Sequence, residues 1–325
     1  MPGVSFHESS LTARSRWSSR SALSRPYRDH KQLYHPLRRE NILLSIFYGI
    51  ISAASWGAAD FIGGLASKRT SPYRILFLAE IAGLVPFTVI ALLIDEKFPP
   101  AWEMFLGAGS SLLGLTGLLI LYRALADGQM TIAAPVSALF AALVPVIFGF
   151  FTLGAPPLTT LIGFGFAFLA VWFISQTEST NWRVPLHGLR NLADLRLPLL
   201  SGLFFGLYFI IIHRATLNAF FWPLSAARFA GLVAFGLYAL IARQPAMPPR
   251  DLWGFCILNG IIDIAGNAFY ILSAQTGRID VAAVLGALYP ASTVLLAWMI
   301  LKEKISWVQT FGVVLAFAAI VLFTI

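Results

Sequence analysis

The chain has 325 residues, of which 58% are hydrophobic and only 12% charged, and its mean hydropathy is +0.77. Because soluble proteins are far less apolar, this composition indicates a membrane protein and argues against a water-soluble fold. The net charge of +8 comes largely from the first 41 residues, and no nucleic-acid-binding motif accompanies it, so no nucleic-acid partner is expected. The single cysteine, Cys256, excludes an intrachain disulfide.

Residues 1–41 form a basic N-terminal tail that is rich in Arg and Ser, with eight Arg or Lys against three acids. The tail lacks the apolar run of a cleaved secretory signal, so such a signal is not expected. Its composition predicts a disordered segment, and an amphipathic targeting peptide is the alternative.

After Glu40 the sequence is a series of apolar segments separated by short loops. Each segment is about 20 residues long, the length that a helix needs to cross a hydrocarbon core roughly 30 Å thick. The polar stretch 176–196 is interpreted as a connector between two halves. Hydropathy therefore predicts an all-α membrane protein with ten transmembrane helices, at approximately 42–66, 74–94, 101–122, 130–153, 157–175, 197–216, 222–242, 251–273, 279–301 and 306–325.

The two halves carry an internal repeat. Residues 76–92 and 224–240 are identical at nine of seventeen positions, at a constant offset of 148. A second match relates 128–139 to 277–288 at an offset of 149. Chance similarity between apolar segments is the alternative, but two matches at almost the same offset favour a duplicated unit.

The duplication predicts a first five-helix repeat at 42–175 and a second at 197–325. Because five is an odd number, the second repeat enters the membrane with the opposite orientation, which makes an inverted repeat about an axis in the membrane plane. Inverted repeats commonly enclose a central polar cavity that opens alternately to the two sides by rocking of the helix bundles.

In the first span, Ser52, Trp56 and Asp60 are spaced at i, i+4 and i+8, so they share one helix face. Trp56 offers a stacking surface and Asp60 a charge inside an apolar span, which makes both candidate residues of a substrate or proton pathway. The alternative is structural, because Asp60 lies eight residues before Lys68 and could reach a water-filled mouth without any function.

Glu80 and Arg228 occupy equivalent positions of the two repeats with opposite charges. Each lies about six residues, or roughly 9 Å, inside its predicted helix. Because inverted repeats place those helix starts on opposite membrane faces, we expect the two side chains to lie near opposite mouths and not to pair. Arg228 is a candidate for binding a substrate carboxylate and Glu80 for carrying a proton, with local ion pairs as the structural alternative.

The eighth span is the richest in polar groups, with Asn259, Asp263 and Asn267 at i, i+4 and i+8 on one face. Polar groups are costly in lipid, so this face is expected to point into the bundle. Asp263, about midway along the span, is a candidate proton acceptor, and the two amides are candidate substrate contacts. Hydrogen bonds that only hold helices together are the alternative for all three.

Pro290 follows Tyr289 in the ninth span and is expected to kink that helix and free a backbone carbonyl toward the interior. Pro135 and Pro145 predict a similar effect in the fourth span. Tyr289 and Tyr270 are candidate substrate contacts, with ordinary helix packing as the alternative.

No catalytic constellation is found in the sequence. Cys256 has no plausible base partner, and neither a metal-ligand spacing nor a phosphate-binding glycine loop occurs. We therefore expect no enzymatic activity, no catalytic residue, no metal and no cofactor. A non-transport membrane scaffold remains an alternative.

The last two spans and part of the first carry a family resemblance. The matching features are the break at Tyr289-Pro290, the Leu-Lys-Glu at 301–303 that ends the ninth span, Gly312 in the last span, and Ser55-Trp56-Gly57 in the first. With ten helices in two repeats, they resemble the drug/metabolite transporter (DMT) superfamily, EamA type, over about 42–325. The first repeat departs from the pattern, with Ala155 in the position that Glu303 has in the second.

The resemblance implies a secondary active transporter of small polar metabolites such as amino acids, in most cases an exporter, in the plasma membrane. Multidrug or toxic-compound efflux is the alternative, because nine Trp and 27 Phe could line a promiscuous pocket. The expected partners are a small-molecule substrate and the lipid bilayer, with protons as a candidate coupling ion and a homodimer as an open question.

Membrane orientation is ambiguous from charge alone. With the N-terminus in the cytoplasm, each side of the membrane holds eleven Lys or Arg, but without the tail the ratio is three to eleven against that orientation. The resemblance implies that both termini are cytoplasmic, and this is the orientation that we adopt as an expectation.

Overall fold

The computed structural model describes residues 39–126, 130–176 and 195–325. All regular elements in these ranges are helices. The predicted disordered tail at 1–41 and the connector at 176–196 lie almost entirely outside the described residues.

The helices follow the apolar segments of the sequence closely. Nine segments of the described chain are long and apolar enough to cross a membrane, and α5 is an apolar helix of 17 residues. Together they confirm an all-α, multi-pass integral membrane protein with ten spans. In chain order the elements are α1 (Arg39–Ser67), α2 (Pro72–Leu93), α3 (Ala101–Ala126), α4 (Met130–Leu153), α5 (Leu158–Ile174), α6 (Arg196–Ala215), α7 (Phe221–Ile241), η3 (Arg250–Leu252), α8 (Trp253–Thr276), α9 (Ile279–Gly286), α10 (Tyr289–Leu296), η4 (Ala297–Leu301) and α11 (Trp307–Thr324).

The ninth span is broken where the sequence predicts a kink. Helix α9 ends at Gly286 and α10 begins at Tyr289, with Pro290 in the first turn of α10. Proline is tolerated there because the first turn of a helix needs no backbone donor. In contrast, α4 continues as one helix through Pro135 and Pro145.

The surface of the described chain is apolar, as expected for helices that contact lipid. Phe105, Phe151 and Trp307 are 76%, 81% and 89% exposed. The buried positions are instead rich in small residues, which allow helices to approach closely when lipid supplies no hydrophobic driving force. Serine side chains such as Ser45 and Ser52 are fully or almost fully buried between helices.

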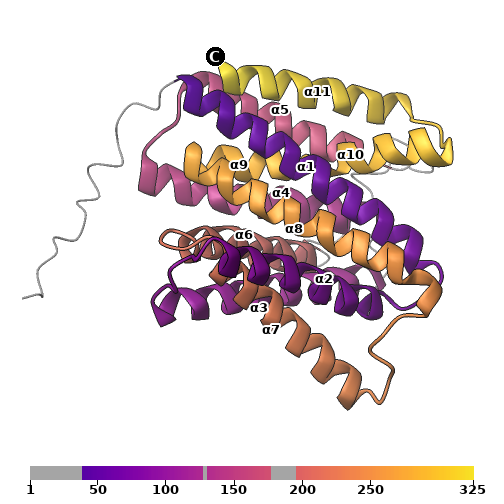
Figure 1. Ribbon diagram of the computed structural model, residues 1–325. Helices are drawn as coiled ribbons and strands as arrows, with labels where there is room; N and C mark the ends of the chain where they lie inside the picture. The colour runs from indigo at the N-terminus through magenta and orange to yellow at the C-terminus, as the bar shows by residue number, and fades with distance from the viewer. Residues whose placement is uncertain (1–38, 127–129, 177–194) are drawn as a thin grey trace, which may run out of the picture. The chain divides into compact units, whose positions relative to one another are not determined.

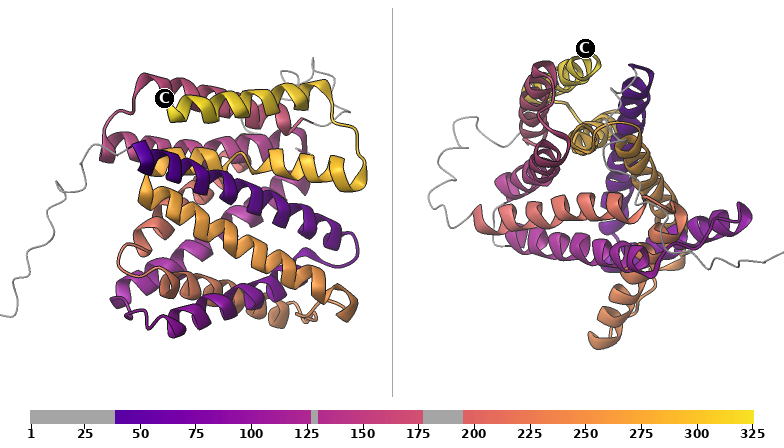
Figure 2. Two further views of the ribbon diagram at one scale, coloured as in Figure 1. Left: turned by 45° about the horizontal axis from the view of Figure 1, so that its top comes forward. Right: turned by 90° about the vertical axis from the view of Figure 1, so that its left-hand side faces the viewer.

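The helix contacts of one repeat are repeated in the other after exchange of equivalent helices. Helix α1 packs along α8, and its equivalent α6 packs along α3. Helices α2 and α7 are equivalent and pack on each other, as do α5 and α11. Figures 1 and 2 show α1 beside α8 and α5 beside α11 from different directions. This exchange is the pattern that an inverted repeat requires.

Helix ends provide a second sign of the duplication. Asp95 and Arg243, 148 residues apart, follow α2 and α7 with φ of 51° and 50°. The next residue of each donates its N–H to a carbonyl five residues earlier, Glu96 to Ala91 and Gln244 to Ala239, both at 2.9 Å. Such a left-handed residue closes the last turn of a helix. The two copies therefore share the same helix termination.

Buried serines show the same symmetry between helices. In the first repeat, the Ser52 hydroxyl donates to the carbonyl of Gly266 on α8 at 2.8 Å. In the second, the Ser201 hydroxyl donates to the carbonyl of Gly117 on α3 at 2.8 Å. The two donors are 149 residues apart, as are the two acceptors, so these bonds connect equivalent pairs of helices across the two repeats.

Candidate functional site

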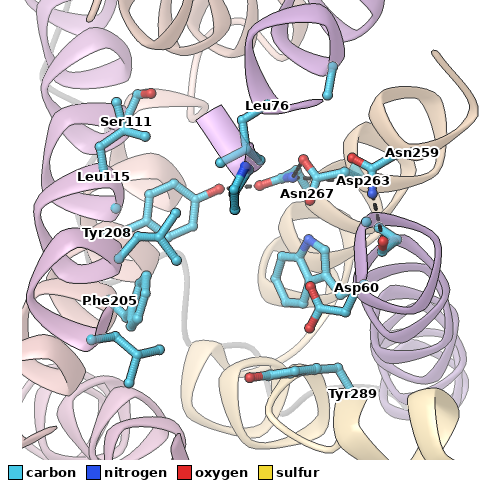
Figure 3. Close-up of a pocket in the computed structure, with 18 of the residues that line it drawn as sticks. Asp60, Leu76, Ser111, Leu115, Phe205, Tyr208, Asn259, Asp263, Asn267 and Tyr289 are labelled. Atoms are coloured by element: carbon cyan, nitrogen blue, oxygen red, sulfur yellow. Dashed lines mark hydrogen bonds between the residues drawn. The ribbon is translucent and has the colours of Figure 1, made fainter. Parts of the chain in front are cut away.

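A cavity of about 800 Å³ lies between the two repeats. It is lined by residues from α1, α2, α3, α4, α6, α7 and α8, and by Tyr289 at the start of α10. Four charged side chains line it, namely Asp60, Glu80, Arg228 and Asp263. Figure 3 shows the labelled lining residues around this space. The volume falls in the range typical of small-molecule sites.

Arg228 lies at the centre of a cluster of charges. Its Nη1 donates to Glu80 Oε2 at 3.3 Å, and its Nη2 donates to Asp263 Oδ2 at 2.5 Å. Glu80 is 8% exposed, and the Arg228 side chain is 13% exposed. The expectation that Glu80 and Arg228 lie at opposite mouths is therefore wrong, because the two side chains form an ion pair inside the bundle.

The reason for this pairing is the crossing of α2 and α7, which pack directly on each other. Helix α2 begins at Pro72, so Glu80 lies eight residues, about 12 Å, inside it, deeper than the sequence suggested. Two equivalent glycines leave room for the Glu80 and Arg228 side chains between the helices. A Cβ at Gly231 would lie 2.8 Å from the Glu80 carboxylate, and one at Gly83 would lie 3.3 Å from Arg228 Cδ.

Asn267 extends the cluster along α8. Its Nδ2 donates to the backbone carbonyl of Asp263 at 2.8 Å and to Asp263 Oδ2 at 3.3 Å. Its Oδ1 accepts a hydrogen bond from the hydroxyl of Tyr208 on α6. Asn267 thus orients Asp263 from one side while Arg228 holds it from the other, and the predicted common face of Asp263 and Asn267 does line the cavity.

Asn259, one turn before Asp263, also lines the cavity, but its amide is used for helix packing. Asn259 Nδ2 donates to the carbonyl of Ala59 on α1 at 2.6 Å. A Cβ at the neighbouring Gly63 would lie 3.1 Å from this nitrogen. Asn259 therefore fits the structural alternative, a hydrogen bond that holds α8 against α1, better than a substrate contact.

Asp60 and Trp56 form the α1 side of the cavity. Asp60 is exposed to the cavity and has no hydrogen bond or ion pair with any residue that the structure describes. Trp56 packs closely between two glycines of the second repeat, since a Cβ at Gly266 or at Gly286 would lie 2.5 or 2.8 Å from its ring. The shared face predicted for these residues is therefore directed at the cavity.

The two candidate tyrosines occupy different places. Tyr289 lines the cavity at the break between α9 and α10, and Figure 3 shows it facing Asp60 across the space. Tyr270 is fully buried and its ring packs at a tilt against Trp56 and Phe209, while its hydroxyl donates to the Phe209 carbonyl at 3.1 Å. It is not among the lining residues, so we assign it to packing.

Tyr208 is the main lining residue that sequence reasoning missed. It lies in the uninterrupted apolar run of α6, where a single phenol resembles any interfacial or packed aromatic residue. Only its bond to Asn267 and its place on the cavity reveal its role. Ser111 and Ser137 also line the cavity, and the sequence does not single them out because each is a small hydroxyl inside an apolar helix.

Neither His nor Cys is among the lining residues, and the described part of the chain has no group of three or more His, Cys, Asp and Glu side chains that could hold a metal. The arrangement combines fixed charges, amides, hydroxyls and aromatic rings around a space large enough for a small molecule.

Comparisons with known proteins show the fold and the family of this chain. A crystal structure at 14% sequence identity aligns with 86% of this chain and 98% of its own at a TM-score of 0.67, which shows a common fold alone. No curated protein matches the chain. The family model for the EamA-like transporter family matches residues 43–176 and 195–325, one match for each repeat. Since these matches cover nearly the whole chain, the protein belongs to the EamA-like transporter family.

Proposed function

We propose that this protein is a secondary active transporter that exports small polar metabolites, such as amino acids, across the plasma membrane by alternating access. The observation that supports this function is the cavity of about 800 Å³ between the inverted repeats, lined by four charged side chains. Membership of a transporter family implies transport and not catalysis. Both termini are assigned to the cytoplasm.

The mechanism follows from the symmetry of the repeats. Inverted repeats can exchange conformations, so that a cavity open to one side in one state is open to the other side in the next. Glu80 and Arg228 bridge the repeats on α2 and α7, and Gly83 and Gly231 keep those helices close. Rocking of the repeats therefore rearranges the surroundings of Arg228.

Proton coupling is assigned to Asp263. Its ionised carboxylate is held by Arg228 and Asn267, so a proton on Asp263 would weaken its ion pair with Arg228. Release of Arg228 in one state of the transport cycle and its return in the other would link proton entry to substrate export. A carboxylate at this depth is costly unless it is paired or protonated, which favours such a coupled exchange.

Metabolite profiling of cells that overexpress the protein tests this function. We expect at least one compound to accumulate outside cells with the wild-type protein, and Asp263→Asn to lower that accumulation about tenfold or more at matched membrane abundance. Asp251→Asn is the matched control, because Asp251 is a surface acid paired with Arg69, with side chains 55% and 60% exposed. It should export as the wild type does.

The outcomes separate the candidate functions. Export by Asp263→Asn at the wild-type rate would remove Asp263 from the mechanism. No difference between the wild type and an empty vector for any metabolite would contradict metabolite export. Multidrug efflux would then be the better assignment if wild-type cells alone resisted toxic compounds, a reading that the aromatic wall of Trp56, Phe205 and Phe209 supports.

A further inference from the structure

The three acids that line the cavity are not equivalent. Glu80 and Asp263 both form ion pairs with Arg228. Asp60 has neither a hydrogen bond nor an ion pair with any residue that the structure describes, although its side chain is exposed to the cavity. An ionised carboxylate in an otherwise apolar span is costly without a partner. When it is ionised, Asp60 can therefore take a partner that the described chain does not supply.

The balance of charge in the cavity favours a positively charged partner. The lining holds three carboxylates, of Asp60, Glu80 and Asp263, against one guanidinium, of Arg228. That guanidinium already serves two of the three acids through its two terminal nitrogens. A ligand carboxylate that approached this guanidinium would also come close to the two acids that it already contacts. A ligand cation meets no such obstacle.

The walls near Asp60 suit an organic cation in particular. Trp56 lies one helical turn before Asp60, so the two side chains share a face of α1. Tyr289 faces Asp60 from the start of α10, and its hydroxyl has no hydrogen-bond partner among the described residues. The faces of aromatic rings attract cations and also contact apolar ligand groups. Asp60, Trp56 and Tyr289 together form an acidic site with aromatic walls.

We propose that the transported ligand is an organic amine without a carboxylate, whose ammonium group binds Asp60 and contacts the rings of Trp56 and Tyr289. This assignment rests on the transport function proposed above and narrows its substrate class from small polar metabolites to amines, in place of amino acids. An aliphatic amine is positively charged at neutral pH, as the site requires. The remaining volume of the cavity accepts the apolar part of the ligand.

Three probes with the same phenyl group test the assignment directly. Phenethylamine carries only the ammonium group, phenylalanine carries both charges, and 3-phenylpropionate carries only the carboxylate. Binding of each to the purified full-length protein in detergent at pH 7 is measured by isothermal titration calorimetry. We expect phenethylamine to bind at least about tenfold more tightly than either of the others. Equal affinity for all three probes, no binding of any of the three, or tighter binding of 3-phenylpropionate than of phenethylamine would overturn the proposal.

Variants then locate the ammonium site. Asp60→Asn should abolish the preference for phenethylamine, while Asp60→Glu, which keeps the charge, should retain part of it. Asp251→Asn, a surface acid outside the cavity, should leave the preference unchanged. Retention of the full preference by a folded Asp60→Asn protein would contradict the role of Asp60. The three-probe comparison on the wild type needs no variant, so it decides the ligand class even if Asp60→Asn does not fold.

Failure of this assignment can be told apart from failure of the transport function. If wild-type cells export an anion or an amino acid while purified protein shows no preference for the amine, transport stands and the amine assignment is wrong. If purified protein prefers the amine but cells export no compound, ligand recognition stands and transport is contradicted.

Discussion

Arg228→Met is expected to be the most destabilising substitution in the cavity. It leaves two acids, Glu80 and Asp263, without the cation that both contact. Removal of one partner from a buried ion pair costs about 3–5 kcal/mol, because an uncompensated charge stays in a poorly solvated place. Since the Asp263 side chain is 33% exposed to the cavity, we expect the lower end of this range, about 3 kcal/mol. The thermal midpoint of the purified protein in detergent is the measurement.

Neutralising the two acids should reverse this loss. The triple variant Glu80→Gln, Asp263→Asn, Arg228→Met removes all three charges while keeping similar side-chain sizes, so its thermal midpoint should lie clearly above that of Arg228→Met. Transport should be absent in the triple variant, because the charges of Glu80, Arg228 and Asp263 are gone. A triple variant no more stable than Arg228→Met would show that the loss comes from packing of the long side chain and not from charge.

Gly57→Ala is expected to disturb the contact between α1 and the broken ninth span. A Cβ at Gly57 would lie 2.4 Å from the backbone carbonyl oxygen of Tyr289 and 2.5 Å from Ser292 Cβ. Backbone cannot rotate away as a side chain can, so α1 and α10 must separate. Overpacking of a core costs about 1–3 kcal/mol, and we expect the upper end here, measured as a lowered thermal midpoint.

Gly64→Ala on the same helix is the matched control. A Cβ at Gly64 would meet no atom within 4 Å. Because Ala is favoured over Gly in a helix by about 1 kcal/mol, this variant should be as stable as the wild type or slightly more stable. If Gly57→Ala and Gly64→Ala behaved alike, the close approach of α1 to Tyr289 would be contradicted. Reduced export by a folded Gly57→Ala protein would further indicate that the break must move against α1.

Several features could be predicted because they can be recognised from the order of residues along the chain. The apolar segments set the ten spans, since a span must be long enough for the hydrocarbon core whatever surrounds it. The offset of 148 predicted the duplication. The equivalent helix ends at Asp95 and Arg243 display it in the structure. The helical period placed Asp263 and Asn267 on one face, and Pro290 marked the break in the ninth span.

The partners of the polar side chains could not be predicted in this way. Sequence spacing suggested separate mouths for Glu80 and Arg228, whereas the crossing of α2 and α7 brings them within 3.3 Å. It also treated Tyr270 and Tyr289 alike, although one is buried behind Trp56 and the other lines the cavity. A helix period states which residues share a face, but the rotation and crossing of helices decide what that face meets.

The same distinction applies to the acids of the cavity. Composition and periodicity identified Asp60 and Asp263 as charges inside apolar spans, and both line the cavity. Which of them has a partner depends on where α7 places the Arg228 guanidinium, through contacts between segments far apart in the chain. Hydropathy and the repeat thus sufficed for the membrane fold and the candidate residues, because neither depends on which segments meet in space. The pairing of Asp263 and the open position of Asp60 arise from helix packing, because ion pairs depend on distances in space and not on spacing along the chain.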